Sequence, residues 1–343
     1  MILGTDGRKD AEWNIKLRHS PNNMVLIQGK PGMGKTLLNC ELVNGASNDG
    51  VPSVVFDWSD SYNASMFPKE KLTYFDVSKE GLGINPFKRQ TQYIDENPVP
   101  EDDDLIVYRI VDILEKGMGI KGMEQIATVQ KHLFNMIEND GPAASFPYLY
   151  VLLGNNPLAE RLRCLAKSTL YSEKLNWKKI LQPGKILVVQ LSKINAHLRY
   201  LFAELILSDL WNETKSGNLG DYLLCLDEIQ HMRMDRMSVM QNMLRESRKY
   251  AVAMLLATQF IGDITDKGAR LALEQAAQRI YFNQAEKSIT ATAKCIDNVN
   301  YLRWKPILRE LDKFEFVFVG NVLVDGKPQN LRCKLKFAPK LLI

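Results

Sequence analysis

A short glycine-rich stretch between an apolar run and a helical pattern restricts the fold of this chain more than any other feature. Residues 24–28 read MVLIQ, and residues 29–36 read GKPGMGKT, which matches the pattern G-x-x-x-x-G-K-[ST]. Glycines let successive backbone N–H groups turn inward around phosphates, toward which the positive end of a helix dipole also points. The pattern predicts a strand, a phosphate-binding loop and a helix that hold a nucleoside triphosphate. The residues expected at the phosphates are Gly29, Lys30, Pro31, Gly32, Met33, Gly34, Lys35, Thr36 and Leu37.

Two side chains of this loop have specific expected roles. Lys35 is expected to reach the β and γ phosphates, and Thr36 to offer its hydroxyl to Mg²⁺. An incidental glycine loop is the alternative. The strand pattern before the loop and the helix pattern after it favour the phosphate site.

A second motif, YLLCLDE at residues 222–228, is an apolar run that ends in two carboxylates. If the run is a strand beside the phosphate loop, Asp227 holds Mg²⁺ and Glu228 orients and deprotonates the attacking water. Consecutive residues at a strand end point in different directions, so the two carboxylates can take different roles. Such a pair by itself often only caps the next helix. Its combination with the phosphate loop favours hydrolysis.

A third element is a basic helix end followed by an apolar run, at residues 244–259. Gln259 at the end of the run can sense the γ phosphate or its attacking water through neutral hydrogen bonds. Arg245 or Arg248 can supply a planar cation to the transition state, often across a subunit boundary. The alternative is that these arginines only complement the dipole at the helix end.

Apolar runs alternate with helical patterns along the chain. The runs lie at residues 24–29, 53–57, 186–191, 222–227 and 251–257, and they are typical of parallel strands buried on both faces. Helical patterns at 35–45, 195–213 and 237–248 separate some of them. This alternation predicts an α/β fold with a doubly wound, mainly parallel sheet and a ligand site at the carboxyl ends of the strands.

We expect one domain over residues 1–343, with a mainly helical insertion at about 85–185 and a β-hairpin at about 314–338. The acidic run at 101–104 is expected to be a solvated loop, because four adjacent side chains cannot converge on one ion.

Composition indicates the cellular compartment of the protein but not its activity. The formal net charge of +4 is too small to indicate a coat for nucleic acid, although it allows a local basic stripe. The five cysteines form no C-x-x-C pair, which suits a reducing cytosol and argues against a zinc site or a disulfide framework. Apolar runs of membrane-spanning length and a signal-peptide pattern are both lacking, so we expect a cytoplasmic protein without membrane insertion.

Together, GKPGMGKT, LLCLDEIQ and RESRKYAVAMLLATQ resemble the HerA/FtsK superfamily of P-loop motor ATPases, over about residues 1–285. The tripeptide Asn85-Pro86-Phe87 and the long interval between the two nucleotide motifs add to the resemblance. Asp57, at the end of the second apolar run, is a secondary site candidate. The resemblance implies a RecA-like fold, ATP and Mg²⁺, and a ring, expected to be a hexamer. In such a ring a neighbouring arginine completes each site and duplex DNA is threaded through a channel.

The segment before Gly29 is too short for the N-terminal β-barrel of archaeal HerA proteins, which favours a barrel-less relative or the motor part of a longer chain. The chain looks closer to the HerA-like ATPases of anti-phage defence and DNA restriction than to FtsK, which implies a helicase-type DNA translocase with a nuclease or other partner. Basic residues proposed for DNA contacts are Lys193, Arg199, Arg233 and Arg236.

Two alternatives stay open. A type IV secretion or conjugation ATPase shares all three motifs without the DNA substrate. An ATP-dependent oligomeric switch or scaffold would bind nucleotide with little turnover, but it has no need of a catalytic carboxylate such as Glu228.

Overall fold

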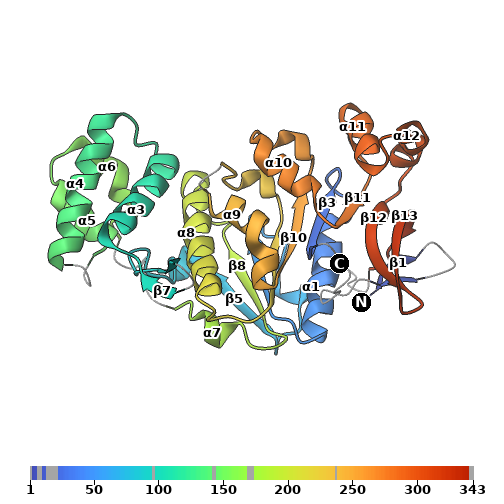
Figure 1. Ribbon diagram of the computed structural model, residues 1–343, viewed down its shortest axis with the longest axis horizontal. Coiled ribbons are helices and arrows are strands. Elements are labelled where there is room, and N and C mark those ends of the chain that lie inside the picture. Colours follow the sequence, from blue (N-terminus) through green and yellow to red (C-terminus); the bar gives the residue numbers. More distant parts are fainter. Residues whose placement is uncertain are drawn as a thin grey trace. The chain divides into compact units, whose positions relative to one another are not determined.

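The computed structural model describes residues 2–5, 10–12, 22–94, 97–140, 144–167, 174–235 and 238–339. The chain divides into two compact units. The first consists of Met1–Tyr74, Ile180–Gln190 and Gly220–Ile343, and the second of Phe75–Lys179 and Leu191–Leu219. The first unit contains a large sheet, and the second is mainly helical (Figure 1).

Within the described residues, eleven strands form one sheet, in the order β13-β1-β2-β12-β11-β3-β10-β9-β4-β8-β5. The six strands from β11 to β8 run parallel to one another, whereas β12 is antiparallel to β11. The bounds are β1 Ile2–Thr5, β2 Asp10–Glu12, β3 Met24–Gln28, β4 Ser53–Asp57, β5 Leu72–Asp76, β8 Ile186–Gln190, β9 Tyr222–Leu226, β10 Val252–Thr258, β11 Gln278–Tyr281, β12 Glu315–Val324 and β13 Lys327–Lys336.

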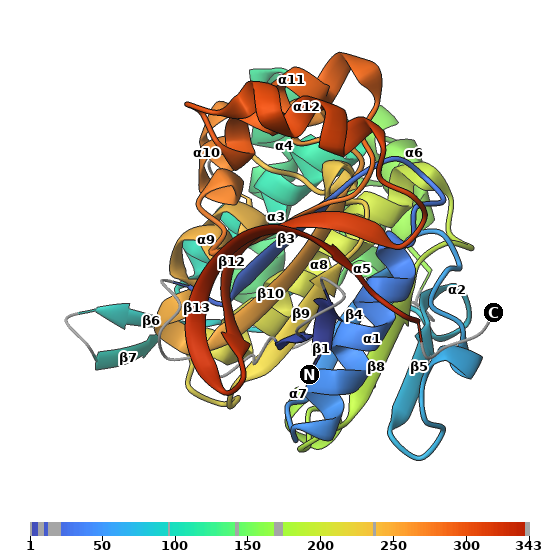
Figure 2. The same ribbon diagram turned by 90° about the vertical axis from the view of Figure 1, so that its right-hand side faces the viewer.

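All five predicted core strands are confirmed as β3, β4, β8, β9 and β10, and each of their residues is buried. Burial on both faces explains why these strands read as continuous apolar runs. Helix α1 (Lys35–Asn48) covers one face, where its Leu38 and Val43 belong to the same apolar core as Val25 and Cys225. Helix α9 (Val239–Glu246) lies on the other side of the sheet (Figure 2).

The strand register brings the carboxyl ends of the central strands together. Gln28 at the end of β3 lies opposite Thr258 on β10 and Tyr281 on β11. On the other side of β10, Leu256 lies opposite Leu226, the last residue of β9. The loops that follow β3, β9 and β10 are therefore neighbours, as a doubly wound sheet requires of its ligand site.

The predicted C-terminal hairpin is present and extends the sheet. Strands β12 and β13 pair along their full length, and β12 also pairs with β11. In Figure 2 the hairpin is the long curved pair of dark red strands. Helices α11 (Glu286–Ile296) and α12 (Tyr301–Arg309) pack against β11 and β12 through Tyr281, Val317 and Trp304. Helix α10 (Lys267–Glu274) precedes β11.

The second unit is built mainly from helices, as the pattern between residues 85 and 185 predicts. Its one small sheet pairs β6 (Thr91–Ile94) with β7 (Asn97–Pro100). The helices are α2 Val77–Glu80, α3 Asp103–Met118, α4 Met123–Asp140, α5 Phe146–Leu153, α6 Pro157–Leu162, α7 Trp177–Ile180, which ends at the border of the unit, and α8 Ala196–Lys215.

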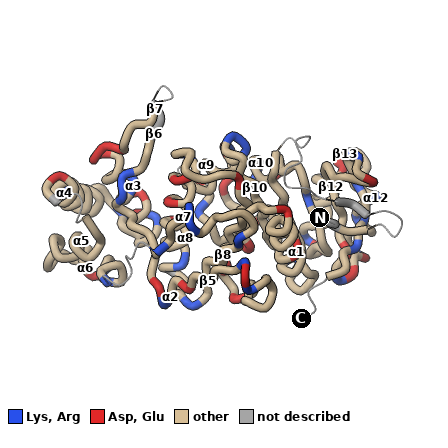
Figure 3. The backbone as a smooth tube through the Cα atoms, turned by 90° about the horizontal axis from the view of Figure 1, so that it is seen from below, with Lys and Arg blue, Asp and Glu red and all other residues tan. Residues whose placement is uncertain are grey.

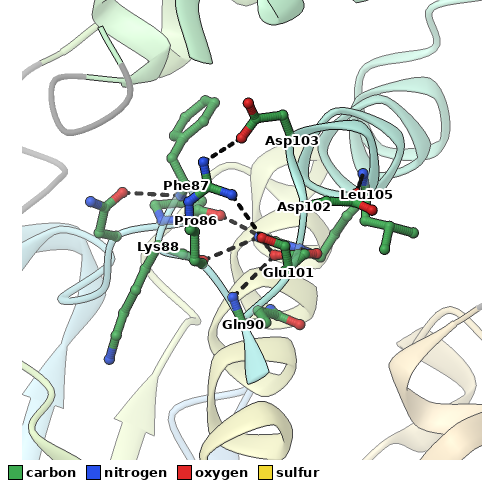
Figure 4. A network of polar contacts seen from close by, with 11 residues as sticks. Pro86, Phe87, Lys88, Gln90, Glu101, Asp102, Asp103 and Leu105 are labelled. Atoms are coloured by element: carbon green, nitrogen blue, oxygen red, sulfur yellow. Dashed lines mark hydrogen bonds and ion pairs between the residues drawn. The ribbon is translucent and has the colours of Figure 1, made fainter. Parts of the chain in front are cut away.

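A buried ion pair fixes the base of the β6–β7 hairpin in this unit (Figure 4). Arg109 on α3 donates to both carboxylate oxygens of Glu101, at 3.0 and 2.9 Å, and to the carbonyl of Pro86 at 2.7 Å. Asp102 caps α3 by accepting from the amide of Leu105. The expectation of a solvated loop at 101–104 is therefore wrong for Glu101, which is buried because Arg109 reaches it from two turns along the helix.

The described residues contain neither a helix with the length and apolar character needed to cross a membrane nor a cluster of three or more His, Cys, Asp or Glu side chains suited to a metal ion.

Candidate nucleotide-binding site

The glycine-rich loop connects β3 to α1, and its glycines are required by the backbone. Gly32 and Gly34 have φ values of 78° and 107°, in the region that disfavours side chains. A Cβ on Gly34 would lie 2.6 Å from Cδ1 of Phe314, and one on Gly29 would lie 2.5 Å from Cβ of Phe282. The loop therefore fits tightly between neighbouring segments and places the first amides of α1 at a cavity.

Lys35, the first residue of α1, points back along the loop. Its Nζ donates to the carbonyls of Gly29 at 2.8 Å and Lys30 at 3.0 Å. Burial lowers the pKa of Lys35, and the carboxylates of Asp227 and Glu228 oppose this effect. The ammonium is thus held at the loop between backbone carbonyls and two acidic residues, where it can meet a phosphate.

Thr36 and Asp227 meet directly. The Thr36 hydroxyl donates to Oδ2 of Asp227 at 3.0 Å, although the two residues lie on different elements, α1 and the end of β9. Burial raises the pKa of Asp227, and the nearby charge of Glu228 raises it further. A buried carboxylate is stabilised by a nearby cation. Together with the neighbouring hydroxyl it offers the oxygen ligands that Mg²⁺ prefers.

Tyr62 also forms a hydrogen bond with Asp227, although it belongs to none of the sequence motifs. Its side chain is fully buried, and its hydroxyl donates to Oδ2 of Asp227 at 3.0 Å while accepting from Nδ2 of Asn39 at 2.8 Å. Tyr62 lies in the loop after β4. The position after a core strand is the only sequence signal for it, because no spacing rule links residue 62 to residue 227.

Asp57 holds the loop after β4 in place through hydrogen bonds. Its carboxylate accepts from the amides of Ser61 at 3.1 Å and Tyr62 at 3.0 Å, and from Nε2 of Gln190 at 2.9 Å. The side chain is completely buried and does not line the nucleotide cavity. The structure therefore places this secondary candidate beneath the site, where it holds the loop that carries Tyr62.

Glu228 has a left-handed backbone conformation, with φ 50° and ψ 48°. Such a conformation costs a residue with a side chain about 1 to 3 kcal/mol, and it is found most often at functional sites. It turns the chain sharply after β9, so that Asp227 is buried while the Glu228 side chain stays accessible at the cavity.

A chain of amide and hydroxyl groups connects Glu228 to β10. Gln230 donates to the Glu228 carboxylate and accepts from the hydroxyl of Thr258 at 2.7 Å. Nε2 of Gln259 lies 3.5 Å from the same carboxylate. The predicted pair Glu228 and Gln259 is thus brought together, and Gln230, which was not among the predicted site residues, is an additional link.

Lys35, Thr36, Asp227 and Glu228 line a cavity of about 570 Å³ in the first unit. Four segments form its walls: the phosphate loop with the start of α1, the loop after β4, the carboxylates that follow β9, and the segment just before β12. The lining residues are Pro31, Gly32, Gly34, Lys35, Thr36, Leu37, Ser59, Asp60, Ser61, Asn63, Met66, Asp227, Glu228, Lys313 and Phe314.

Arg245 and Arg248 are not part of this cavity. They line a second one, of about 610 Å³, together with Asn22 and Met24 at the start of β3. This is the opposite end of the parallel strands from the phosphate loop. Both arginines are exposed, and neither forms an ion pair with a described residue. Within one copy of the chain they cannot act on the phosphates at the other end of the strands.

The basic residues proposed for DNA contacts are engaged within the chain where they are described. Lys193 lies 3.4 Å from Asp76, Arg199 donates to the backbone carbonyls of Ser192 and Ile194, and Arg233 pairs with Asp235. Arg236 lies outside the described residues. Lys and Arg are interspersed with Asp and Glu over the fold, in keeping with the small net charge (Figure 3).

The sequence matches no protein-family model, and a search of curated proteins finds no relative. Solved structures are similar. VirB4 of Thermoanaerobacter pseudethanolicus has a TM-score of 0.72 with 15% identity, over 99% of this chain and 96% of that one. The plasmid coupling protein TrwB in complex with ADP and Mg²⁺ has a TM-score of 0.58 with 13% identity, over 94% and 86%.

The chain has the fold of these proteins. It is a RecA-like P-loop fold, as the resemblance implies. A third structure, TrwB with the ATP analogue ADPNP, has a TM-score of 0.60 with 12% identity and covers 93% of this chain and 86% of that one. The similarity to VirB4 extends over the C-terminal hairpin, which the sequence motifs do not reach.

Proposed function

We propose that this chain is a ring-forming motor ATPase that translocates duplex DNA. The observation that carries the proposal is the convergence of Lys35, Thr36, Asp227 and Glu228 at one cavity beside a helix N-terminus. Gln259, at the end of β10, lies 3.5 Å from the Glu228 carboxylate. This set contains each component that phosphoryl transfer from ATP to water requires: a phosphate cradle, a metal-binding pair and a base.

Each residue has a distinct task in this reaction. Lys35 exchanges its two carbonyl partners for the β and γ phosphates. Thr36 and Asp227 would hold Mg²⁺, which would supply positive charge to the phosphates. Glu228 takes a proton from the water that attacks the γ phosphorus, and the bond to the β-γ bridging oxygen breaks to release ADP. Gln259 lies close enough to the Glu228 carboxylate to orient the same water.

The second cavity supports a ring. Arg245 and Arg248 lie at the opposite end of the strands from the phosphate loop, where they can reach the site of a neighbouring copy but not their own. An arginine supplied in this way stabilises the transition-state charge. We therefore propose an oligomer, with a hexamer as the expected size, in which each ATP is hydrolysed between two copies. We further propose that the motor acts with a nuclease or other DNA-processing partner, as in HerA-like defence systems.

A secretion or conjugation ATPase is the second candidate. The structural similarity to VirB4 and to the conjugative coupling protein TrwB favours it as strongly as the geometry of the site favours a HerA-like translocase. The two candidates share the chemistry of the site and differ in what the motor moves.

Steady-state ATP hydrolysis with and without duplex DNA, at several protein and salt concentrations, separates the candidates. Lys35→Ala serves as the blank. Turnover that rises with protein concentration, and again with DNA in a salt-dependent way, supports the translocase, because DNA contacts are mainly to phosphates. Turnover indifferent to DNA supports the secretion-type motor. Tight ATP binding without turnover indicates a switch and contradicts the motor.

A further inference from the structure

Two residues just before β12, Lys313 and Phe314, form one wall of the nucleotide cavity although they lie far along the chain from the phosphate loop. The motif-based resemblance ends before them. The amide of Phe314 donates to the carbonyl of Met33 in the phosphate loop at 3.0 Å. The carbonyl of Phe314 accepts from the amide of Phe337 at 3.1 Å. The wall is therefore attached to the loop on one side and to the end of β13 on the other.

The backbone of this wall is strained. Phe314 has a φ of 70°, in the left-handed region that bulky residues rarely adopt. Its ring lies against Gly34, where a Cβ would come within 2.6 Å of it, and it packs edge-on against Phe337 with ring centroids 5.1 Å apart. Such strain persists only where the surroundings impose it, and strained positions cluster at ligand sites.

The order of the strands decides which end of a nucleotide faces this wall. Strands β10 and β9, which carry Gln259 and the carboxylates Asp227 and Glu228, lie on one side of β3. Strands β11 and β12 lie on the other side. A γ phosphate placed for attack at Glu228 therefore directs the nucleoside away from β9, toward the segment that precedes β12.

The chemistry of the wall matches a nucleoside with its first phosphate. The Phe314 ring is half-buried and offers an apolar surface to a base. The Lys313 side chain is exposed, and its Nζ lies 5.0 Å from the centroid of that ring. Among the described residues, its Nζ has no hydrogen-bond or ion-pair partner. The wall thus combines a π surface with a cation that can turn toward a phosphate.

We propose that Lys313 and Phe314 form the nucleoside-binding wall of the ATP site. The Phe314 ring supports the base, and the Lys313 ammonium pairs with the α phosphate. This inference rests on the proposed ATP site, and it assigns the segment before β12 to that site.

Two probes separate the parts of the site: ATP, and inorganic tripolyphosphate, which has three phosphates and no nucleoside. Binding of each with Mg²⁺ is measured by calorimetry. Phe314→Leu should weaken ATP binding about tenfold, because the base loses its stacking surface, and leave tripolyphosphate binding unchanged. Lys313→Ala should weaken both probes to a similar extent.

Matched variants test whether these effects are local. Phe134→Leu removes a half-buried ring on α4, in the second unit, and Lys327→Ala removes a lysine at the other end of the hairpin. Both should bind ATP as the unchanged protein does, and melting temperatures establish that all variants are folded.

Two results would overturn the inference: unchanged ATP affinity in Phe314→Leu, or an equal loss for both probes, which would mean that the ring only supports the shape of the loop. Failure of the ATP site itself has a different signature. Lys35→Ala should abolish binding of both probes, and if it binds them normally the proposed function fails, whatever Phe314 does.

Discussion

The hydroxyl of Tyr62 donates a hydrogen bond to Oδ2 of Asp227 at 3.0 Å, the same oxygen that accepts from the hydroxyl of Thr36. Through this bond the loop after β4 is attached to the carboxylate at the end of β9. This hydrogen bond favours the charged form of Asp227 and so partly offsets the effect of burial on its pKa.

Tyr62→Phe should therefore weaken the response to Mg²⁺ more than the binding of nucleotide. A hydrogen bond to a charged group contributes about 1.5 to 3 kcal/mol, so half-maximal ATPase activity should need roughly ten times more Mg²⁺. Titration of the activity with Mg²⁺ at fixed ATP measures this. Tyr74→Phe, which removes a hydroxyl bonded to Gln190 instead, is the control. An identical Mg²⁺ dependence of the two variants would contradict the role of Tyr62.

Glu228→Gln should retain ATP binding and lose most turnover, about 100-fold or more, because the amide keeps the shape of the side chain but cannot accept the proton. Nucleotide binding and steady-state hydrolysis are measured on the same sample. Glu246→Gln, at the exposed end of α9, should leave both unchanged. Normal turnover in Glu228→Gln would remove its assignment as the base.

Asp227→Asn should raise the melting temperature of the nucleotide-free protein at neutral pH. Burial raises the pKa of Asp227 above its ordinary value of 3.8, so the folded chain binds this proton more tightly than the unfolded chain. Stability is then lost as the pH rises through the window between 3.8 and the raised pKa, and a residue that cannot ionise avoids this loss.

Thermal unfolding over a pH series checks this prediction. The advantage of Asp227→Asn should shrink as the pH falls into that window, and it should reverse when ATP and Mg²⁺ stabilise only the unchanged protein. Asp263→Asn, an exposed position, is the control. A difference in stability that does not vary with pH would show that ionisation of Asp227 is not its cause.

Subunit mixing tests the role of Arg245 and Arg248. Alanine at the residue that acts across the boundary should lower ATP hydrolysis about 1,000-fold. Mixing that variant with Lys35→Ala should restore activity, because some sites then combine an intact phosphate loop with an intact arginine. Lys249→Ala, next to Arg248, should remain active alone. If no mixture regains activity, the arginines do not act between copies.

Arg109→Met should destabilise the second unit by about 3 to 5 kcal/mol, because it leaves the buried Glu101 carboxylate without its partner. Hydrogen exchange of the α3 amides localises the effect to this unit. Arg163→Met, which breaks an ion pair between side chains that are 73% and 70% exposed, should change stability by less than about 1 kcal/mol. Equal effects of the two variants would contradict the importance of burial.

The sequence alone predicts the elements in which local pattern and burial agree. A strand such as β9 is buried on both faces, so its composition is apolar throughout, and the carboxylates that follow mark its end. The phosphate loop can also be predicted from local sequence, because its glycines are required by positive φ angles within a stretch of six residues.

The remaining parts of the site depend on pairing between distant segments. Tyr62 reaches Asp227, and Phe314 reaches Met33, only because the sheet order brings β4 beside β9 and the start of β12 close to the phosphate loop. The pattern of apolar residues within each segment gives no information about the order of the strands in the sheet. Likewise, the separation of Arg245 from Gln259 follows from the length of β10, at whose opposite ends the two residues lie.

The position of β3 in the sheet has a consequence for synthesis on the ribosome. Its two neighbours are β10 and β11, formed by residues 252–258 and 278–281, so this apolar strand emerges long before either partner exists. An unpaired apolar strand readily joins other chains. The nascent chain therefore carries β3 without its partners until residues 252–281 have been made, and the phosphate loop can take its final place beside β10 and β11 only after that.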